Sequence, residues 1–440
     1  MRIGQGDTAA HLSYCSNVHP GEDWPAHFAQ LREHIPAVRD AMRRRDRAPE
    51  RRADPGPPGP HGSASDDGAG VDAPFGIGLR LSARALSNLE NDAAFAEFRA
   101  WLDAEDAYVF TINGFPFGPF HGEAVKADVY RPDWSETARL DYTCRLASLL
   151  ARLEPPDRFG SISTLPGTFK AWTSSERETA IADNLLKAVA HCVRLERDSG
   201  VRIALAIEPE PCCLLETAEE TAAFFETRLS NPDGVRRLAT LAGLDACDAR
   251  QALRRHLGVC HDVCHSAVEF ESPSDAFARY AGSGVDVVKL QLSSALKLTD
   301  VTEKTLRHLA RFDEPVYLHQ VVERRGDTLS RHEDLGGAMS AARHRLERRA
   351  TLAADVTVVL AEDAPEWRVH FHVPVFLERT GPFSTTRDTL ADVLELQRRH
   401  GIAAHLEVET YTWDVLPSEL RDVPSSVAIA RELDWVLERL

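Results

Sequence analysis

Long apolar runs are absent from this sequence of 440 residues. No stretch approaches the roughly 20 consecutive apolar residues that a membrane-spanning helix needs. The opening residues, MRIGQGDTAAHLSY, also lack the apolar core of a secretory signal peptide. We therefore expect a cytoplasmic protein that has no membrane span.

Positive charge is scarce as well. The chain has 51 Lys and Arg residues against 68 Asp and Glu residues, so its formal net charge is −17 at pH 7. A chain with this balance repels phosphate backbones unless its positive charge is concentrated on one surface. The composition therefore argues against a nucleic acid as the partner of this protein.

Cysteine is infrequent, with eight residues in the whole chain. Several of them lie inside apolar runs, where a small hydrophobic side chain would also fit, and reduced thiols are the default in the cytoplasm. Cys260 and Cys264 form a C-x3-C pair, but no second pair follows at the spacing of a zinc finger. We interpret both as packing residues rather than as ligands of structural zinc.

One segment, Arg43 to Pro74, has almost no large apolar residue and is rich in Arg, Pro, Gly and Asp. Such a composition cannot bury enough surface to offset the entropy lost on ordering. We predict that residues 43–74 are a disordered insertion between the first helix and the second strand.

Elsewhere, short strand-like runs alternate with longer helix-like runs. Repeated strand and helix units predict a parallel sheet with helices outside, and their number suits a closed (β/α)8 TIM barrel. An apolar fraction of 43% is enough for one large core, so we expect a single α/β domain over residues 1–440. The ten candidate strands are two too many. We assign VYLHQVVE and WRVHFHVPVF to a long excursion after the seventh barrel strand, over residues 297–376.

Polar side chains recur on one face of several predicted strands. Because strand side chains alternate between two faces, the apolar row of RIALAIEPE is predicted to face the helices, and Glu208 is predicted to face the barrel interior. The same sorting places Val288 outward and, on the interior row, Lys289, Gln291, Asp262, His405, Glu407 and Glu409. In WRVHFHVPV it separates His370 and His372 from the apolar row. Active sites of such barrels form where strands end.

Glu208, Asp262 and Glu409 are three carboxylates of this interior set. Three converging carboxylates repel one another unless a cation neutralises them. Oxygen ligands with an occasional histidine suit Mn²⁺, Mg²⁺, Co²⁺ or Zn²⁺, and the sequence does not choose among these four. We therefore predict a divalent metal as the cofactor.

Three motifs resemble the xylose-isomerase-like barrels, the superfamily that contains sugar-phosphate isomerases and epimerases and also endonuclease IV. They are the D-x-x-H of HDVCH, the glutamate that ends the strand in AIEPEP, and the glutamate that ends the last strand in EVETYTWD. More closely, the chain resembles the EboE-type metabolite-traffic barrel proteins from Leu12 to Pro417. The stretches that carry this resemblance are LSYCSNVHPGEDW, FGIGLRLS, YVFTINGFPFGPFHG, GSISTLPGTFK, EPEPCCLLET, KLQLSSAL and ETYTWDVLP.

The resemblance implies a metal held by Glu208, Asp262, Gln291 and Glu409. The superfamily usually has histidine where this chain has Gln291, and His372 is the alternative imidazole ligand. The resemblance also implies that Glu208 and Glu409 act as the acid and base, and that His265 contacts substrate. Proteins of the same metabolite-traffic pathway are the implied partners, beside the small-molecule metabolite itself.

Further substrate contacts are expected from four polar residues: Asn113, His121, Lys289 and His370. For Lys289, an ion pair with Glu208 or Asp262 is the alternative. The segment GFPFGPFHG, Gly114 to Gly122, interleaves Gly and Pro with Phe, which predicts a rigid loop that walls the pocket with aromatic surface.

Three functions fit these residues. The leading one is a metal-dependent isomerase or epimerase that acts on a small hydroxylated metabolite, because carboxylates beside a metal suit proton abstraction next to a carbonyl. The second is a non-catalytic carrier or scaffold that binds the metabolite in the barrel pocket, since a fold does not determine a function. The third is an endonuclease IV-like hydrolase, which the net charge of −17 opposes.

Overall fold

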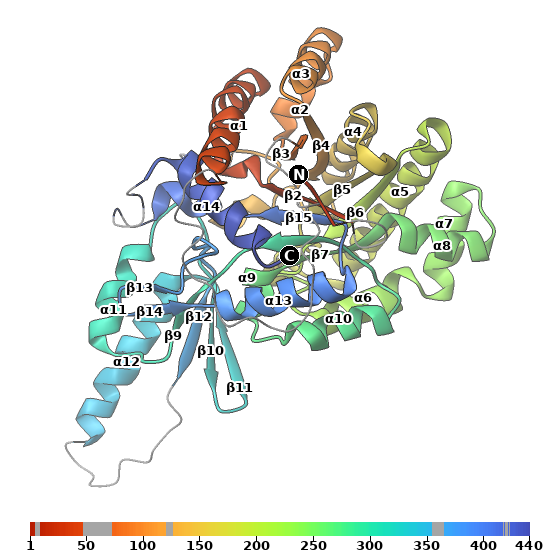
Figure 1. The fold of residues 1–440 in the computed structure, drawn as a ribbon. Coiled ribbons are helices and arrows are strands. Elements are labelled where there is room, and N and C mark those ends of the chain that lie inside the picture. Colours follow the sequence, from red (N-terminus) through yellow and green to blue (C-terminus); the bar gives the residue numbers. More distant parts are fainter. Residues whose placement is uncertain are drawn as a thin grey trace, which may run out of the picture.

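The fold is described from a computed structural model, which covers residues 1–4, 9–46, 73–119, 126–353, 365–416, 418, 421 and 423–440. Eight parallel strands form a barrel surrounded by helices, as expected (Figure 1). From β3 to β8, each strand pairs with the next along the chain, and β15 then lies between β8 and β2. The barrel strands are β2 (Ala10–Tyr14), β3 (Phe75–Arg80), β4 (Ala107–Asn113), β5 (Phe159–Thr164), β6 (Arg202–Ile207), β7 (Leu257–Asp262), β8 (Val287–Leu292) and β15 (His405–Val408).

The barrel closes between β2 and β3, and side chains make much of this contact. The backbones meet at one isolated parallel bridge, between Cys15 and Gly78. Ser13 Oγ donates to Gly76 O at 2.8 Å and accepts from Gly78 N at 3.1 Å, and Ser16 Oγ accepts from Arg80 N at 2.8 Å. A short strand, β1 (Arg2–Ile3), pairs antiparallel with the start of β2.

Helices outside the barrel cover its apolar outer row. The longest, α5 (Ser175–Ser199), begins after Ser174, whose side chain accepts from the amide of Arg177, and ends at Gly200, whose φ of 69° suits glycine. The other barrel helices are α1 (Trp24–Asp46), α2 (Ala83–Leu89), α3 (Asp92–Ala104), α4 (Thr137–Arg152), α6 (Ala218–Phe224), α7 (Pro232–Ala242), α8 (Ala246–His256), α9 (Val263–Val268), α10 (Pro273–Gly282), α13 (Arg387–His400) and α14 (Ser425–Leu437). None of the described helices is both long and apolar enough to cross a membrane.

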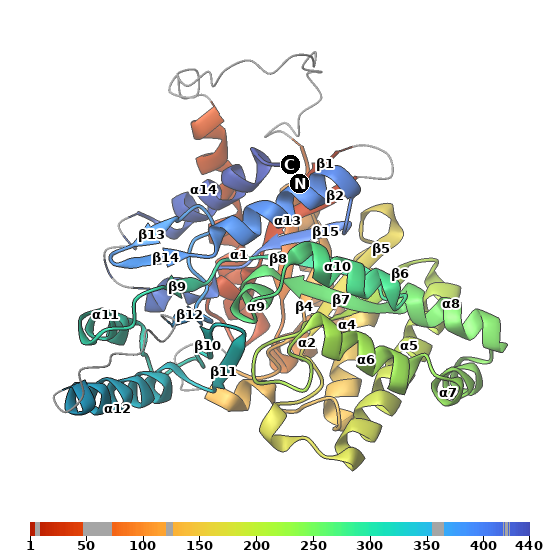
Figure 2. The same ribbon diagram turned by 90° about the horizontal axis from the view of Figure 1, so that it is seen from below.

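The chain between β8 and β15 builds a second, six-stranded sheet, which we call the excursion (residues 296–385; Figure 2). Its strands are β9 (Leu296–Leu298), β10 (Val321–Arg325), β11 (Thr328–His332), β12 (Glu366–Val369), β13 (Arg379–Thr380) and β14 (Phe383–Thr385), in the order β11-β10-β12-β9-β14-β13. Two helices, α11 (Glu303–Leu309) and α12 (Leu335–Ala353), belong to it, and it has its own apolar core around Trp367 and Phe371. The sheet therefore extends beyond the predicted bounds of 297–376 at both ends.

Two local expectations need correction. Helix α1 continues to Asp46, so the first four residues of the predicted insertion are helical, and residues 47–72 lie outside the described part. Val288 does not face outward. A bulge between Val259 and Cys260 shifts the register with β8, and Val288 packs with Ala204, Ala206 and Cys260. Side chains in a regular strand alternate between its two faces, and one extra residue moves the neighbouring side chains to the opposite face.

Candidate functional site

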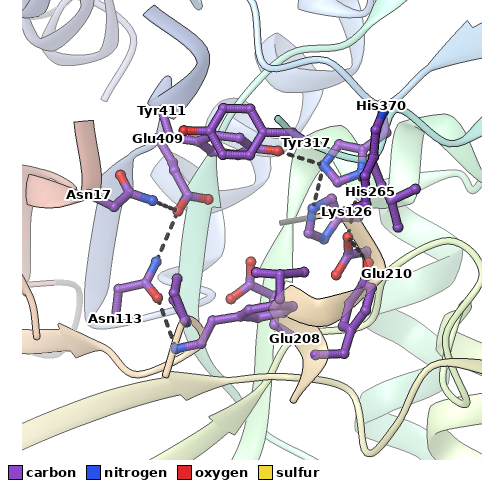
Figure 3. A pocket seen from close by; sticks show the side chains of 15 residues that line it. Asn17, Asn113, Lys126, Glu208, Glu210, His265, Tyr317, His370, Glu409 and Tyr411 are labelled. Carbon is purple, nitrogen blue, oxygen red and sulfur yellow. Dashed lines mark hydrogen bonds and ion pairs between the residues drawn. The ribbon is translucent and has the colours of Figure 1, made fainter. Parts of the chain in front are cut away.

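A pocket opens at the carboxyl ends of the barrel strands, between the barrel and the excursion. In Figure 3, Glu409 lies on one side of this pocket and Glu210, His265 and His370 on the other, with Glu208 between them. Aromatic side chains form much of the rest, among them Phe115, Tyr130, Tyr317 and Tyr411.

Three carboxylates meet in this pocket region from three strands. Glu208 follows β6, Asp262 ends β7 and Glu409 follows β15, and one oxygen of each lies within 4.8 Å of the others. All three residues are at most 4% exposed. Glu208 Oε2 and Asp262 Oδ2 are buried without a hydrogen-bond partner among the described residues. Unpaired buried oxygens that converge in this way form a donor set that fits a divalent cation.

The electrostatics of the three carboxylates reflect their crowding. Burial, reinforced by Glu409 and Asp262, raises the pKa of Glu208 well above its ordinary range. Burial and the charges of Asp262 and Glu407 raise the pKa of Glu409 to about 8. Burial also acts to raise the pKa of Asp262, but His265 and His372 outweigh it, so that this pKa lies below its ordinary value. Asp262 is thus the member of the set that ionises most readily.

Two asparagines orient Glu409. Asn17, which follows β2, donates from Nδ2 to Glu409 Oε1 at 2.6 Å, and Asn113, which ends β4, donates to the same oxygen at 2.9 Å (Figure 3). Asn113 was predicted to contact substrate; the structure places it on the pocket wall, where it holds the carboxylate. Asp262 is oriented similarly, since its Oδ1 accepts from the amide of His265 at 3.0 Å and from Ser293 Oγ at 2.7 Å.

Three histidines lie beside the carboxylates. His265 belongs to α9, whereas His370 and His372 follow β12 in the excursion. Nε2 of His370 lies 3.1 Å from Nε2 of His265 and 3.1 Å from Nε2 of His372. Burial lowers the pKa of His370 well below its ordinary value and that of His372 to about 4. Besides the three carboxylates, three further sets among the described residues could hold a metal: Asp262 with His265 and His372, Glu210 with His265 and His370, and Cys264 with His370 and His372.

Gln291, predicted as a metal ligand, lies between the carboxylate strands. In the sheet register it is the neighbour of Asp262 on one side and of Glu407 on the other. Its side chain is fully buried, and neither amide atom makes a hydrogen bond of ordinary geometry with the described residues. The amide nevertheless lowers the pKa of Glu409. Gln291 therefore lies beside Asp262, and its role as a metal ligand stays a prediction.

Lys289 differs from both of its expected roles. Its Nζ lies 2.5 Å from Glu407 Oε2, and both side chains are completely buried. It neither pairs with Glu208 or Asp262 nor lines the pocket. The reason is register: β15 lies beside β8 and directs Glu407 into the barrel one layer below Glu409. This ion pair raises the pKa of Lys289 although burial acts in the opposite direction.

The loop that was predicted to wall the pocket does so in part. Phe115 and Pro116 line the pocket, whereas Phe117 packs edge-on against Tyr142 on the barrel exterior. His121, predicted to contact substrate, lies outside the described residues.

Sequence reasoning missed Glu210 and the groups that hold it. Tyr130 donates from its hydroxyl to Glu210 Oε1 at 2.7 Å, and Gln320 Nε2 donates to the same oxygen at 3.2 Å. Glu210 Oε2 has no partner among the described residues, and burial raises the pKa of this carboxyl. The repeated Glu in IEPEP was an available signal for Glu210. Gln320 had none, because only the path of the excursion brings it to the pocket.

Comparison with known proteins finds no matching family model and no matching curated protein. Solved structures of similar shape include a xylose isomerase-like TIM barrel protein from Mycobacterium smegmatis in complex with magnesium, at a TM-score of 0.41, 12% identity and 83% coverage of each chain. The IOLI protein with a bound zinc atom has a TM-score of 0.39 and 10% sequence identity, and the match covers 82% of this chain and 86% of that chain. D-allulose 3-epimerase from Methylomonas sp. in complex with D-allulose has a TM-score of 0.36 and 11% sequence identity, and the match covers 72% of this chain and 84% of that chain. The barrel fold of this chain is assigned from its own strand order and from the closure between β2 and β3.

Proposed function

We propose that this protein is a metal-dependent isomerase or epimerase that acts on a small hydroxylated, sugar-like metabolite. The observation that carries the proposal is the convergence of three buried carboxylates, those of Glu208, Asp262 and Glu409, at the carboxyl ends of barrel strands. Three such groups share so small a space as anions only when a cation neutralises them. Barrel enzymes place their active sites at this end.

We assign Glu208, Asp262 and Glu409 as the ligands of this cation, with Gln291 as a neutral oxygen donor beside them. Mn²⁺, Mg²⁺, Co²⁺ and Zn²⁺ all accept such donors. When bound, the cation supplies an electrophile that polarises a carbonyl or hydroxyl group of the substrate.

Glu208 and Glu409 are our candidates for the acid and base. Each carries a carboxylate in the pocket, where it can take a proton from a substrate carbon or return one to it. They come from β6 and β15, which two other strands separate in the barrel. A substrate between them would therefore meet one carboxylate from each side. Asn17 and Asn113 keep Glu409 in a single orientation for this transfer.

Exchange of carbon-bound hydrogen tests the proposed reaction. The protein, loaded in turn with each of the four metals, is incubated in D₂O with a panel of ketopentoses and ketohexoses and with any metabolite that purifies with it. Deuterium should enter the carbon next to the carbonyl, because the base exposes that position to solvent-derived deuterons. Mass spectrometry and product analysis in the same tube would also detect an isomerase that transfers hydride without exchange.

Glu409→Gln is the matched variant, because a carboxamide keeps the shape and an acceptor oxygen but cannot act as a base. It should bind the same ligand and exchange nothing. If the wild-type protein binds a ligand yet gives neither deuterium incorporation nor product, the carrier function replaces the catalytic one.

Because its motifs resemble those of the EboE-type barrels, we also propose a place for this protein in metabolite traffic, in which a precursor is processed and passed to partner proteins. Mass spectrometry of the small molecules that purify with the protein tests this placement. A hydroxylated metabolite should be found, and its amount should fall in Asp262→Asn protein. Recovery of nucleotides or oligonucleotides instead would contradict it.

A further inference from the structure

We propose that Glu210 binds an ammonium group of the substrate, so that the metabolite is an amino-substituted polyol and not a sugar phosphate. The inference rests on the proposed function, which places the reacting carbon of the substrate near Glu208 and Glu409. In Figure 3, Glu210 lies across the pocket from Glu409, with Glu208 between them. Glu210 is therefore a second point of recognition, separate from the reacting carbon.

Hydrogen bonds hold both the backbone and the side chain of Glu210. Its amide donates to the carbonyl oxygen of Leu215 at 3.0 Å, and its carbonyl oxygen accepts from the amide of Cys213 at 3.2 Å. In the side chain, Oε1 accepts from the hydroxyl of Tyr130 at 2.7 Å and from Gln320 Nε2 at 3.2 Å. The carboxylate is thus fixed in one orientation, with Oε1 turned towards its two donors.

Gln320 can present only its nitrogen to Glu210. Gln320 Nε2 also lies 3.2 Å from the carbonyl oxygen of Pro211, which is an acceptor only. The amide oxygen therefore faces the other way, where it accepts from Nδ1 of His370 at 2.7 Å. Gln320 belongs to the excursion, whereas Glu210 follows β6, so barrel and excursion build this position together.

The second carboxylate oxygen of Glu210 is left for a ligand. Glu210 is 5% exposed and lines the pocket, and its Oε2 has no hydrogen-bond partner among the described residues. Both groups that donate to Oε1 are neutral, so they do not balance the charge of the carboxylate. A buried carboxylate is costly unless a positive charge is paired with it. A ligand hydroxyl would donate to Oε2 and leave the charge unbalanced, whereas an ammonium group does both.

The two histidines beside Glu210 direct their Nδ1 atoms elsewhere. Nδ1 of His265 lies 3.0 Å from the carbonyl oxygen of Pro209, and Nδ1 of His370 donates to Gln320. Their Nε2 atoms lie 3.1 Å from each other, a distance that has room for one hydrogen and not for two. The two rings therefore cannot both be cations, and neither makes a hydrogen bond to Oε2 of Glu210.

The rest of the pocket favours a cation over an anion. Lys126 is the sole Lys or Arg among the described residues that line it, and Nζ of Lys126 donates to Asp334 Oδ2 at 2.7 Å and to the carbonyl oxygen of Glu314 at 3.1 Å. A phosphate group would therefore meet carboxylates with no uncommitted Lys or Arg in this part of the lining. Aromatic faces attract cations, and four aromatic residues line the pocket: Phe115, Tyr130, Tyr317 and Tyr411.

Isothermal titration calorimetry with matched probes tests the proposal. The protein as purified is titrated with D-fructose, 1-amino-1-deoxy-D-fructose, 6-amino-6-deoxy-D-fructose and D-fructose 6-phosphate. At least one amino compound should bind about tenfold or more tightly than D-fructose, because it adds a charged hydrogen bond. The phosphate should bind more weakly than D-fructose. Amino compounds that bind no more tightly than D-fructose, or a phosphate that binds more tightly, would overturn the proposal.

Glu210→Gln is the matched variant, because it keeps the shape of the side chain and removes its charge. Its affinity for the amino compound should fall about tenfold, to that of D-fructose, and its affinity for D-fructose should stay the same. Glu347→Gln removes the same charge from a side chain that is 77% exposed, and it should keep the wild-type preference. A tenfold preference that persists in Glu210→Gln would contradict the assignment.

Circular dichroism checks the fold of each variant. If Glu210→Gln does not fold, a crystal structure of the wild-type protein with the amino compound decides the question. The amino nitrogen should lie within about 3.2 Å of Glu210 Oε2. A nitrogen bound elsewhere, or a metal ion at Oε2, would overturn the proposal.

Failure of this proposal is distinguishable from failure of the proposed function, because binding is measured without turnover. Tight binding of the amino compound with neither deuterium exchange nor product would remove the isomerase and keep the ammonium position. Deuterium exchange into D-fructose without any preference for the amino compounds would keep the isomerase and remove the ammonium position.

Discussion

Two buried layers inside the same barrel treat charge in opposite ways. In the lower layer, Lys289 on β8 meets Glu407 on β15, and one positive charge balances one negative charge. In the upper layer, one step nearer the strand ends, Glu409 meets Glu208 and Asp262, and the groups that hydrogen-bond to Glu409 are the neutral amides of Asn17 and Asn113. Both layers are as buried as the core. The comparison shows how a barrel separates charge that supports its structure from charge that is left for a ligand.

Lys289→Met should have the largest effect on folding. It leaves the carboxylate of Glu407 buried without its partner, and breaking a buried ion pair in this way costs about 3–5 kcal/mol in the free energy of unfolding. Urea denaturation measures the loss. The control Lys304→Met removes an exposed lysine of α11 and should change stability by less than about 0.5 kcal/mol. Equal effects of the two variants would show that the lower layer does not depend on the ion pair.

Gly78→Ala should disturb the lower layer by a steric clash, without changing any charge. A Cβ at Gly78 would overlap the carboxylate of Glu407 and come within 2.8 Å of the Tyr14 carbonyl oxygen. We expect a loss of about 3 kcal/mol, at the upper end of the usual cost of overpacking. Gly337→Ala is the control, because nothing lies within 4 Å of its Cβ and it should stabilise α12 by roughly 0.5–1 kcal/mol. An unchanged melting temperature of the Gly78→Ala variant would mean that Glu407 moves freely.

Glu432→Gln probes a buried carboxyl that belongs to neither layer. Thr410 Oγ1 donates to Glu432 Oε1 at 2.6 Å, and burial raises the pKa of this carboxyl to about 7. Because the folded-state pKa lies above the unfolded value, stability is greatest below pH ~4.5 and declines as the pH rises towards 7. Between pH 5 and 8 the wild type should lose about 2 kcal/mol more than the variant. Parallel pH profiles of the two proteins would contradict the raised pKa.

Glu409→Gln should have the smallest effect on folding, and one of opposite sign to Lys289→Met. In metal-free buffer at pH 7, Glu409 must take up a proton on folding because its pKa rises to about 8, whereas glutamine need not, and we expect a gain of ~1 kcal/mol. Added Zn²⁺ should raise the melting temperature of the wild type more than that of the variant, because the cation binds the folded state through this carboxylate. Destabilisation of the metal-free variant would indicate that the upper layer, like the lower one, is internally balanced.

The candidate site was predictable where it depends on strand periodicity. The alternation of side chains placed Glu208, Asp262 and Glu409 inside the barrel, and the structure brings these three together. Val288 was placed on the wrong face, because a bulge depends on the neighbouring strand and leaves no local trace in the sequence. The partner of Lys289 was wrong for a related reason, since the register of β15 against β8 determines which carboxylate reaches it.

The sequence alone determined which residues are apolar, which strands carry polar side chains at their ends, and therefore which carboxylates meet at the barrel mouth. These properties follow from the two-residue period of a strand, which is local. The tertiary structure decided the rest: the closure of β2 on β3 through serine side chains, the pairing of Lys289 with Glu407, and the contact of His265 with His370 across 105 residues. Such contacts depend on strand register and on the path of a long connection, and chain segments far apart in sequence acquire these only when the whole barrel is assembled.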